Sequence, residues 1–330
     1  MLIAARAKTA RGIAVLKVDT VYLSAVSCLI GFAQGRSAMS GSTNEVSPPG
    51  RSSPTVRSDN WRAKYGPWAV VTGASDGIGR AVAVGLAEAG LNLVLVARRR
   101  NELDVLAAEL AQTHHIETRI VAIDLGQSVA VDAIVSSTED IETGLLAAIA
   151  GFGTSGLFTD NPVGQELEMV DVNCRAVVEL SHHFGRRFAA QRRGGVILMS
   201  SLLAFQGVPR AATYAATKAF IQTFAEGLRL ELSGSGVDVV ASAPGPVRSG
   251  FEARADMRMS AAASPAVVAR GTLNALGRRT TVRPGFLSKF LEASLLPLPR
   301  PARSRIMSVV MGGMTRHQNG GKKQQDAQFA

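Results

Sequence analysis

The stretch WAVVTGASDGIG, residues 68–79, decides the fold of this chain. Its first five residues form an apolar run that ends at Thr72 and predicts a short buried strand. The glycines that follow predict a tight turn, and the apolar periodicity of residues 80–89, ended by Gly90, predicts a helix. A strand, a glycine-rich turn and a helix in this order bring backbone N–H groups and a helix N-terminus to one point, which favours a bound phosphate.

The three glycines of this turn have separate tasks. Gly73 allows the tight turn, Gly77 allows close approach of a pyrophosphate, and Gly79 allows close packing of the helix. Their spacing, Gly-x-x-x-Gly-x-Gly, differs from the shorter dinucleotide fingerprint. A glycine-rich turn alone could be an ordinary loop, but the preceding strand and the following helix argue against that alternative.

Strand and helix patterns alternate along the rest of the central region. Apolar runs predict further strands at residues 91–96, 118–123, 145–150, 196–199 and 237–243. Helices are predicted at residues 101–112 and 128–137, from residue 213 onward, and at 219–232 and 265–276. This alternation predicts an α/β fold with a Rossmann-like, doubly wound parallel sheet in a three-layer α/β/α arrangement. Ligands of such sheets bind beyond the carboxyl ends of the strands.

The end of the second strand carries arginine where an NAD-binding site usually carries an acidic residue. Ala97 lies eighteen residues after Gly79, and Arg98 follows it. A guanidinium at this position can hold a 2′-phosphate, so the sequence favours NADP(H) over NAD(H). The alternative is that Arg98 to Arg100 form the solvated start of the next helix, and we expect this for Arg100.

Tyr214 and Lys218 are four residues apart in an Ala-rich segment, so a helix places them on one face. A nearby cation favours the phenolate and is expected to lower the pKa of Tyr214, which makes the pair an acid–base catalyst at a carbonyl or alcohol oxygen. Ser201 follows the predicted strand at residues 196–199, and its hydroxyl can hydrogen-bond the same oxygen. Taken alone, the Tyr-Lys spacing could also arise by chance.

Together these motifs resemble the short-chain dehydrogenase/reductase family over residues 65–255. Besides the turn and the Ser201, Tyr214 and Lys218 set, the resemblance rests on Asp124-Leu125, on Asn173 within VNCRA, and on PGPVRS at residues 244–249. It implies that Tyr214 is the general acid/base and that Ser201 orients the substrate oxygen. It further implies that Lys218 holds the nicotinamide ribose and that Asn173 supports a water linked to the lysine.

The resemblance also implies a set of residues that bind the cofactor. Asp124 and Leu125 would contact the adenine, and residues 244–249 would lie beside the nicotinamide, with Ser249 where the family often has threonine. The full predicted set is Gly73, Ser75, Asp76, Gly77, Ile78, Gly79, Arg98, Asp124, Leu125, Ala150, Gly151, Tyr214, Lys218, Pro244, Gly245, Val247 and Ser249. Without the family, Asn173 would be interpreted as a kinked-helix or capping residue.

One segment departs from the family pattern. Where the family usually has Asn-Asn-Ala-Gly after the fourth strand, this chain has Ala148-Ile149-Ala150-Gly151. We expect weaker bracing between the central strands, with the backbone of Ala150 and Gly151 still facing the cofactor. This departure keeps open the alternative of a non-catalytic NADP(H)-binding regulator or scaffold.

The ends of the chain differ from its centre. Residues 1–60 are predicted to be a disordered or mis-annotated extension, with Met39 as an alternative start, and residues 61–280 the short-chain dehydrogenase domain. Within it, residues 250–280 supply a substrate lid and a helix, and Met257 and Met259 line an apolar pocket or lie on a solvated loop. Residues 281–330 form a basic amphipathic extension with a disordered end, which lies on an anionic membrane, over the pocket or against a partner subunit.

Charge and cysteine usage limit the classes of function. The formal net charge is +10, of which residues 1–60 supply +4 and residues 278–330 supply +8. The centre is therefore nearly neutral, which argues against a nucleic-acid enzyme. The two cysteines, Cys28 and Cys174, offer no disulfide framework and no metal-ligand spacing, so a cytoplasmic setting and a site without metal are expected.

These observations lead to one functional hypothesis. The chain is predicted to be an NADP(H)-dependent oxidoreductase that reduces a carbonyl or oxidises an alcohol on an apolar small molecule, which is ketoacyl, retinoid-like or steroid-like. The resemblance adds a homo-oligomer as the expected assembly.

Overall fold

The computed structural model describes residues 61–259 and 262–318. The predictions for residues 1–60 and for the disordered end at residues 320–330 lie outside these described residues. Among the described helices, none combines the length and the apolar character needed to cross a bilayer.

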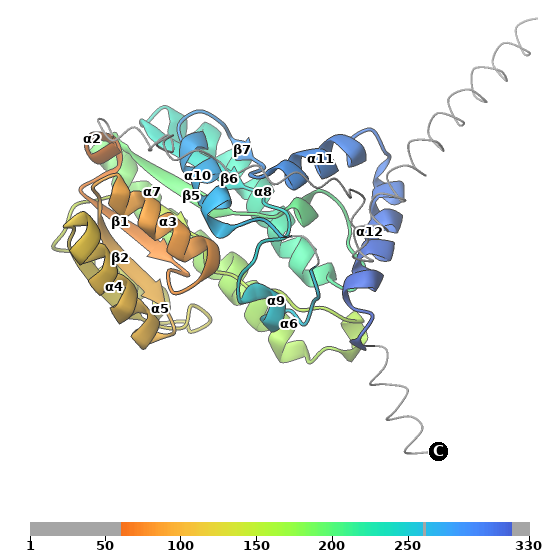
Figure 1. Cartoon of the computed structure of the whole chain (residues 1–330). Helices are drawn as coiled ribbons and strands as arrows, with labels where there is room; N and C mark the ends of the chain where they lie inside the picture. Colours follow the sequence, from red (N-terminus) through yellow and green to blue (C-terminus); the bar gives the residue numbers. More distant parts are fainter. Residues whose placement is uncertain (1–60, 260–261, 319–330) are drawn as a thin grey trace, which may run out of the picture.

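A seven-stranded parallel sheet forms the centre of the protein, in the order β3-β2-β1-β4-β5-β6-β7 (Figure 1). The strands are β1 (Trp68–Thr72), β2 (Asn92–Ala97), β3 (Thr118–Ala122), β4 (Thr143–Ala148), β5 (Gly194–Met199), β6 (Val237–Ser242) and β7 (Thr281–Val282). The order reverses between β1 and β4, which confirms the predicted doubly wound sheet and opens a crevice at their carboxyl ends. The sequence missed β7, because two residues show no periodicity.

Two layers of helices cover the sheet. On one face lie α3 (Gly77–Glu88), α4 (Arg100–His114) and α10 (Pro265–Ala275), whose apolar residues share a core with the alternate residues of β1 and β2. On the other face lie α5 (Ala130–Ser136), α7 (Ala176–Gln191) and α8 (Ala212–Ser233). Short elements complete the chain, namely α2 (Trp61–Tyr65), η2 (Phe158–Asp160), α6 (Val163–Val170), the π-helical η3 (Asp171–Arg175), η4 (Leu202–Phe205) and α9 (Phe251–Arg254).

The two helices predicted from residue 213 and at 219–232 are a single helix, α8. Ala and other good helix formers continue through this segment without glycine or proline until residue 227, so nothing ends the helix between them. The continuous helix matters for the site because its first two turns carry Tyr214 and Lys218.

The C-terminal extension packs against the central domain through its apolar residues. Its helices are α11 (Phe286–Leu295) and α12 (Arg300–Met314), which lie together beside α8 at one end of the molecule (Figure 1). Leu291 and Leu295 from α11 and Ile306, Met307, Val310 and Met311 from α12 belong to the same hydrophobic core as α7 and α8. The apolar face of α12 is therefore buried within the protein.

Thr72 braces the segment after β4, where this chain lacks the asparagines that are usual in the family. Its Oγ1, on a side chain at the buried end of β1, accepts hydrogen bonds from the backbone N–H groups of Ile149 (3.0 Å) and Ala150 (3.1 Å). One hydroxyl thus links the end of β1 to the segment after β4, which offsets part of the bracing that the departure removes.

Substituting Thr72 tests this bracing. In Thr72→Val the N–H of Ala150 loses its acceptor, whereas that of Ile149 keeps a bond to the carbonyl of Ala147. We expect the free energy of unfolding in urea to fall by about 1–2 kcal/mol. Thr72→Ser keeps the oxygen and serves as the control; equal losses in the two variants would show that the hydroxyl does not brace the strands.

Candidate active site

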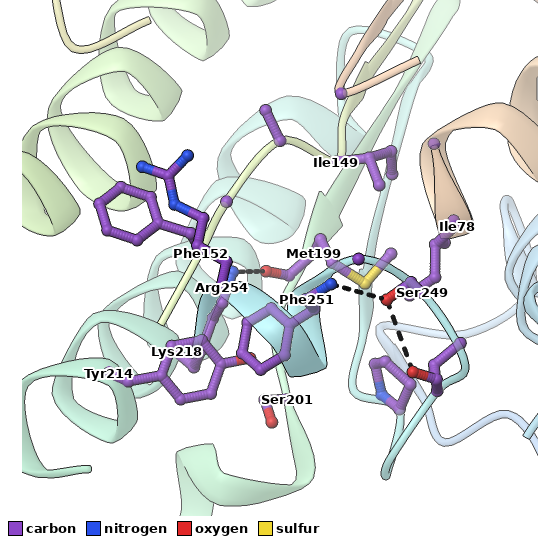
Figure 2. Close-up of a pocket in the computed structure, with 18 of the residues that line it drawn as sticks. Ile78, Ile149, Phe152, Met199, Ser201, Tyr214, Lys218, Ser249, Phe251 and Arg254 are labelled. Atoms are coloured by element: carbon purple, nitrogen blue, oxygen red, sulfur yellow. Dashed lines mark hydrogen bonds between the residues drawn. The ribbon is translucent and has the colours of Figure 1, made fainter. Parts of the chain in front are cut away.

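A single hollow of about 470 Å³ lies at the carboxyl ends of the strands. Every residue predicted to bind the cofactor lines it, and so does Ser201; of the predicted set, Asn173 lies behind the lining. Figure 2 shows Tyr214, Ser201 and Lys218 on one side of this hollow, with Ile78 and Ser249 across from them. The hollow extends from the glycine-rich turn to an apolar wall built by the C-terminal helices.

The glycine-rich turn forms a close cradle at the start of α3. Asp76 caps the helix and accepts a hydrogen bond from the N–H of Gly77 (2.7 Å). A Cβ on Gly79 would lie 2.1 Å from the carbonyl oxygen of Gly73, so only glycine fits there, as predicted for helix packing. Gly73 has φ +71 and faces Ala150, where a Cβ would lie 2.9 Å from the Cα. The residues of this turn line the hollow at the N-terminus of α3, which suits an anionic pyrophosphate.

Residues 244–249 cross the hollow as a strap above the turn. The carbonyl of Pro244 accepts a hydrogen bond from the N–H of Leu202 (2.9 Å), and Gly250 donates its N–H to Asp76 Oδ2 (2.9 Å). Ser249 packs on Gly77, where an added Cβ would lie 2.7 Å from the Ser249 Cβ. Part of the space at Gly77 is therefore needed for Ser249 and not for a pyrophosphate. The sequence did not predict this contact.

Three successive arginines after β2 have different surroundings. Arg98 lies within 3.4 Å of Asp124 and 4.0 Å of Glu168 and faces the hollow. Arg99 also faces the hollow and donates from Nη2 to the carbonyl oxygen and the hydroxyl of Ser75, each at 3.3 Å. Arg100 pairs with Asp104 on the first turn of α4, away from the hollow, as expected for a solvated helix start. The sequence does not identify Arg99, because a run of arginines does not reveal which side chain turns inward.

Tyr214 and Lys218 lie one turn apart on α8 and are both buried. The Lys218 ammonium donates to the carbonyl oxygen of Met199 at the end of β5 (2.9 Å), and it lies 5.7 Å from the centroid of the Tyr214 ring. The hydroxyl of Ser201 interacts with that of Tyr214 and acts to lower the pKa of the phenol. Ser201 also caps η4 by accepting from the N–H of Leu203 (3.2 Å), which fixes its position.

The titration of this pair differs from the sequence expectation. Desolvation by burial raises the pKa of Tyr214 to about 12, and the hydrogen bond from Ser201 opposes this only in part. The expected lowering by Lys218 is not what the structure shows, because the ammonium is directed at Met199 and not at the phenol. Burial lowers the pKa of Lys218 to about 8. At neutral pH Tyr214 is therefore a protonated phenol, ready to donate.

Asn173 holds the backbone beside the tyrosine. It lies in the π-helical turn η3, and its amide forms paired bonds with Phe152: Oδ1 accepts from the N–H (3.1 Å) and Nδ2 donates to the carbonyl (2.9 Å). Nδ2 also donates to Thr217 Oγ1 (3.1 Å). The kinked-helix interpretation is thus correct for its backbone. Its role in supporting a water near Lys218 stays a prediction.

The apolar wall of the hollow comes from the C-terminal extension and from the segment that follows α9. Leu291 and Leu295 belong to α11, and α12 adds Met307, Val310, Met311 and Met314, while Met257 and Met259 come from the segment after α9. With Met199, six of the nine methionines in the chain line this one hollow. The prediction that Met257 and Met259 line a pocket is confirmed. The helical spacing of apolar residues in the extension predicted α11 and α12. It did not show that the apolar faces of these helices turn toward the hollow.

The sequence profile of the family described as short chain dehydrogenase matches residues 67–259. The chain belongs to the short-chain dehydrogenase family. This short-chain dehydrogenase has the fold, the glycine-rich turn and the Ser-Tyr-Lys set in the places where the resemblance put them, and it is an oxidoreductase of the CH–OH/C=O class. The family binds a nicotinamide cofactor.

Several known proteins are similar to this short-chain dehydrogenase. A 7beta-hydroxysteroid dehydrogenase of Collinsella aerofaciens is 37% identical over 180 residues, which cover 54% of this chain and 68% of that protein. A solved 7beta-hydroxysteroid dehydrogenase structure matches with a TM-score of 0.69 and 31% identity, over 74% of this chain and 98% of that one. A short-chain dehydrogenase from Sphingobium yanoikuyae in complex with NADPH matches with a TM-score of 0.63 and 29% identity, over 66% and 87%.

The two perturbed pKa values predict how carbonyl reduction depends on pH. Tyr214, with a pKa of about 12, keeps its proton throughout the neutral range, whereas Lys218 loses its charge as pH rises through about 8. We expect kcat/KM for reduction to be constant below that pH and to fall above it, approaching about tenfold per pH unit. The affinity for NADPH, measured over the same pH range, is the control that separates a change in binding from a change in the proton-transfer step. A rate of reduction that increases from neutral pH to pH 9 would contradict this assignment of the proton donor.

Proposed function

We propose that this short-chain dehydrogenase is an NADP(H)-dependent reductase of bulky apolar ketones, of steroid-like size and shape, with the reverse oxidation of the alcohols. One observation carries the proposal: a single hollow joins a doubly basic end, at Arg98 and Arg99, to a phenol-bearing centre and then to an apolar wall. The basic end suits a 2′-phosphate, the centre suits a carbonyl oxygen, and the wall suits a large hydrocarbon skeleton.

The residues around the glycine-rich turn fit a dinucleotide. The turn with its capped helix N-terminus would hold the pyrophosphate, and Asp124 and Leu125, which line the hollow, would contact the adenine. Arg98 and Arg99 supply two guanidinium groups to the 2′-phosphate, and the hydroxyl of Ser75 lies within hydrogen-bonding distance of Arg99. These guanidinium groups favour NADP(H) over NAD(H). The bound cofactor supplies the hydride, and the protein's own residues manage position and protons.

Tyr214 donates the proton to the substrate oxygen in the direction of reduction. Burial keeps it protonated at neutral pH, and the hydroxyl of Ser201, hydrogen-bonded to it, is close enough to hold the same oxygen. Lys218 lies 5.7 Å from the ring centroid, and we infer that its charge acts on the phenolate that remains after the transfer, whereas burial dominates the pKa of the phenol before it. Asn173 keeps the segment at Phe152, which lines the hollow, fixed beside the tyrosine helix.

The substrate class follows from the wall. Methionine side chains are unbranched and adapt to irregular apolar shapes, and six of them line this hollow. The similarity to 7beta-hydroxysteroid dehydrogenases supports a steroid skeleton over a ketoacyl or retinoid one.

The assembly and location of the protein stay predictions. Because the apolar face of α12 is buried, contact with a membrane would depend on α11, where Phe286 is 85% exposed and Phe290 is 42% exposed. Homo-oligomer formation and a cytoplasmic location are likewise predictions that the fold and the site leave untested.

A panel of ketones of increasing apolar area tests the proposal, with NADPH oxidation as the measurement. We expect kcat/KM to be highest for steroid-sized ketones. Tyr214→Phe should reduce turnover by about 10²–10⁴-fold while NADPH still binds. Tyr65→Phe is the matched control, since that hydroxyl donates to Asp238 (2.6 Å) outside the hollow. A protein that binds NADPH but turns over none of the ketones would instead support the regulator alternative.

Cofactor preference depends on the two inward arginines. We expect Arg98→Ala and Arg99→Ala each to weaken NADPH binding by about tenfold or more and to change NADH binding little, because a charged hydrogen bond to the 2′-phosphate is lost. Arg100→Ala removes the same charge from the solvated side and should leave both affinities unchanged. Isothermal titration with each cofactor measures the effect, and equal losses for NADPH and NADH would refute the assignment.

A further inference from the structure

One hydrogen bond connects the C-terminal extension to the strap that crosses the hollow. Ser288, in the first turn of α11, is 3% exposed, and its Oγ accepts the N–H of Gly245 at 2.7 Å. The contact is close, because a Cβ on Gly245 would lie 3.0 Å from that oxygen. Gly245 lines the hollow, so a residue outside the matched family segment holds a backbone group that faces the cofactor site.

This bond adds to the contacts that already hold the strap at both ends and at Val247. Pro244 is bonded to Leu202, next to Ser201, and Gly250 is bonded to Asp76 at the glycine-rich turn. Val247 forms an isolated parallel bridge with Ala263, on the outer side of the strap. The bond from Ser288 therefore fixes the position of Gly245 between the contact with Leu202 and the contact with Asp76.

The helix that carries Ser288 is itself held against the catalytic turn. Arg283, just before α11, forms an ion pair with Glu292 (2.8 Å), and its guanidinium lies 4.3 Å from the centroid of the Phe205 ring. Phe205 ends η4, the short helix that Ser201 caps. On the inner side of α11, Leu291 and Leu295 follow Ser288 by three and seven residues and line the hollow. Strap, apolar wall and Ser201 turn are thus connected through one helix.

We propose that Ser288 is a positioning residue of the active site, through which the C-terminal extension sets the strap at residues 244–249 relative to Ser201 and Tyr214. The inference rests on the proposed function, because the strap is the part of the site that would lie beside the nicotinamide. Hydride transfer depends steeply on the separation and alignment of the reacting carbons, so a small displacement of Gly245 slows the reaction without abolishing binding. The C-terminal extension therefore contributes to the geometry of the active site.

Ser288→Ala removes the acceptor and tests the contact in two ways. In the cofactor-free protein, hydrogen–deuterium exchange of the peptide that contains Gly245 should become about fivefold faster or more. With NADPH and a steroid ketone, kcat should fall by about tenfold, and the affinity for NADPH should change by less than about threefold, because the turn and the arginines still hold it. The primary isotope effect on kcat with NADPH deuterated at the transferred position should increase, since the hydride step becomes slower.

Ser294→Ala is the matched control on the same helix. Its hydroxyl donates only to the carbonyl of Phe290 within α11 among the bonds of the described residues, so exchange, kcat and isotope effect should all stay at wild-type values. Ser288→Thr keeps the hydroxyl and should restore most of the turnover. Ser288→Cys, which keeps the volume but is a weak acceptor, replaces the alanine variant if that variant does not fold.

The outcomes separate this inference from the proposed function. Wild-type kcat and isotope effect in Ser288→Ala, or equal changes in Ser288→Ala and Ser294→Ala, would overturn the positioning role. If the wild-type protein turns over none of the ketones, the proposed function fails. The exchange measurement needs no turnover, so unchanged exchange at Gly245 in Ser288→Ala would then overturn the contact by itself.

Discussion

The site depends on how the protein accommodates a buried ammonium at the carboxyl end of β5. Lys218 is 4% exposed, and a charge in that position requires a partner. Its Nζ donates to the carbonyl of Met199 (2.9 Å), and in return Ser200 donates its hydroxyl to the carbonyl of Lys218 (3.0 Å). These reciprocal bonds fix the first turns of α8 against the end of β5. Tyr214 lies one turn before Lys218 and Ser201 lies directly after Ser200, so both hydroxyls are positioned by the same pair of bonds.

This arrangement changes the electrostatic role that the lysine has in the protein. A cation held at hydrogen-bonding distance from the phenol would favour the phenolate, but here the ammonium is directed at a backbone carbonyl and burial dominates the titration of both groups. Tyr214 therefore carries its proton at neutral pH.

The C-terminal extension adds apolar side chains to the hollow. The segment matched by the family ends at residue 259, yet α11 and α12 contribute six apolar residues to the lining. An amphipathic helix must bury its apolar stripe, and in this chain the stripe of α12 is buried against the substrate side of the domain. Of the described basic residues in the extension, Lys289, Arg300, Arg305 and Arg316 are exposed, whereas Arg283 and Arg303 are partly buried.

The sequence determined the fold class and the glycine-rich turn, and it predicted that Tyr214 and Lys218 share one face of a helix, because each depends on local patterns: period-two and period-3.6 apolar runs, glycine where a Cβ has no room, and Tyr214 four residues before Lys218. Tertiary structure alone decided three further points. It turned Arg99 as well as Arg98 toward the hollow, it bonded Thr72 to the segment after β4, and it placed Ser288 of the extension against Gly245. In each case the two residues lie far apart in the chain, and the sequence around each of them does not predict the contact. The pKa of Tyr214 is likewise a tertiary property, because it depends on where the buried ammonium of Lys218 points. The spacing of the two residues along the helix does not specify that direction.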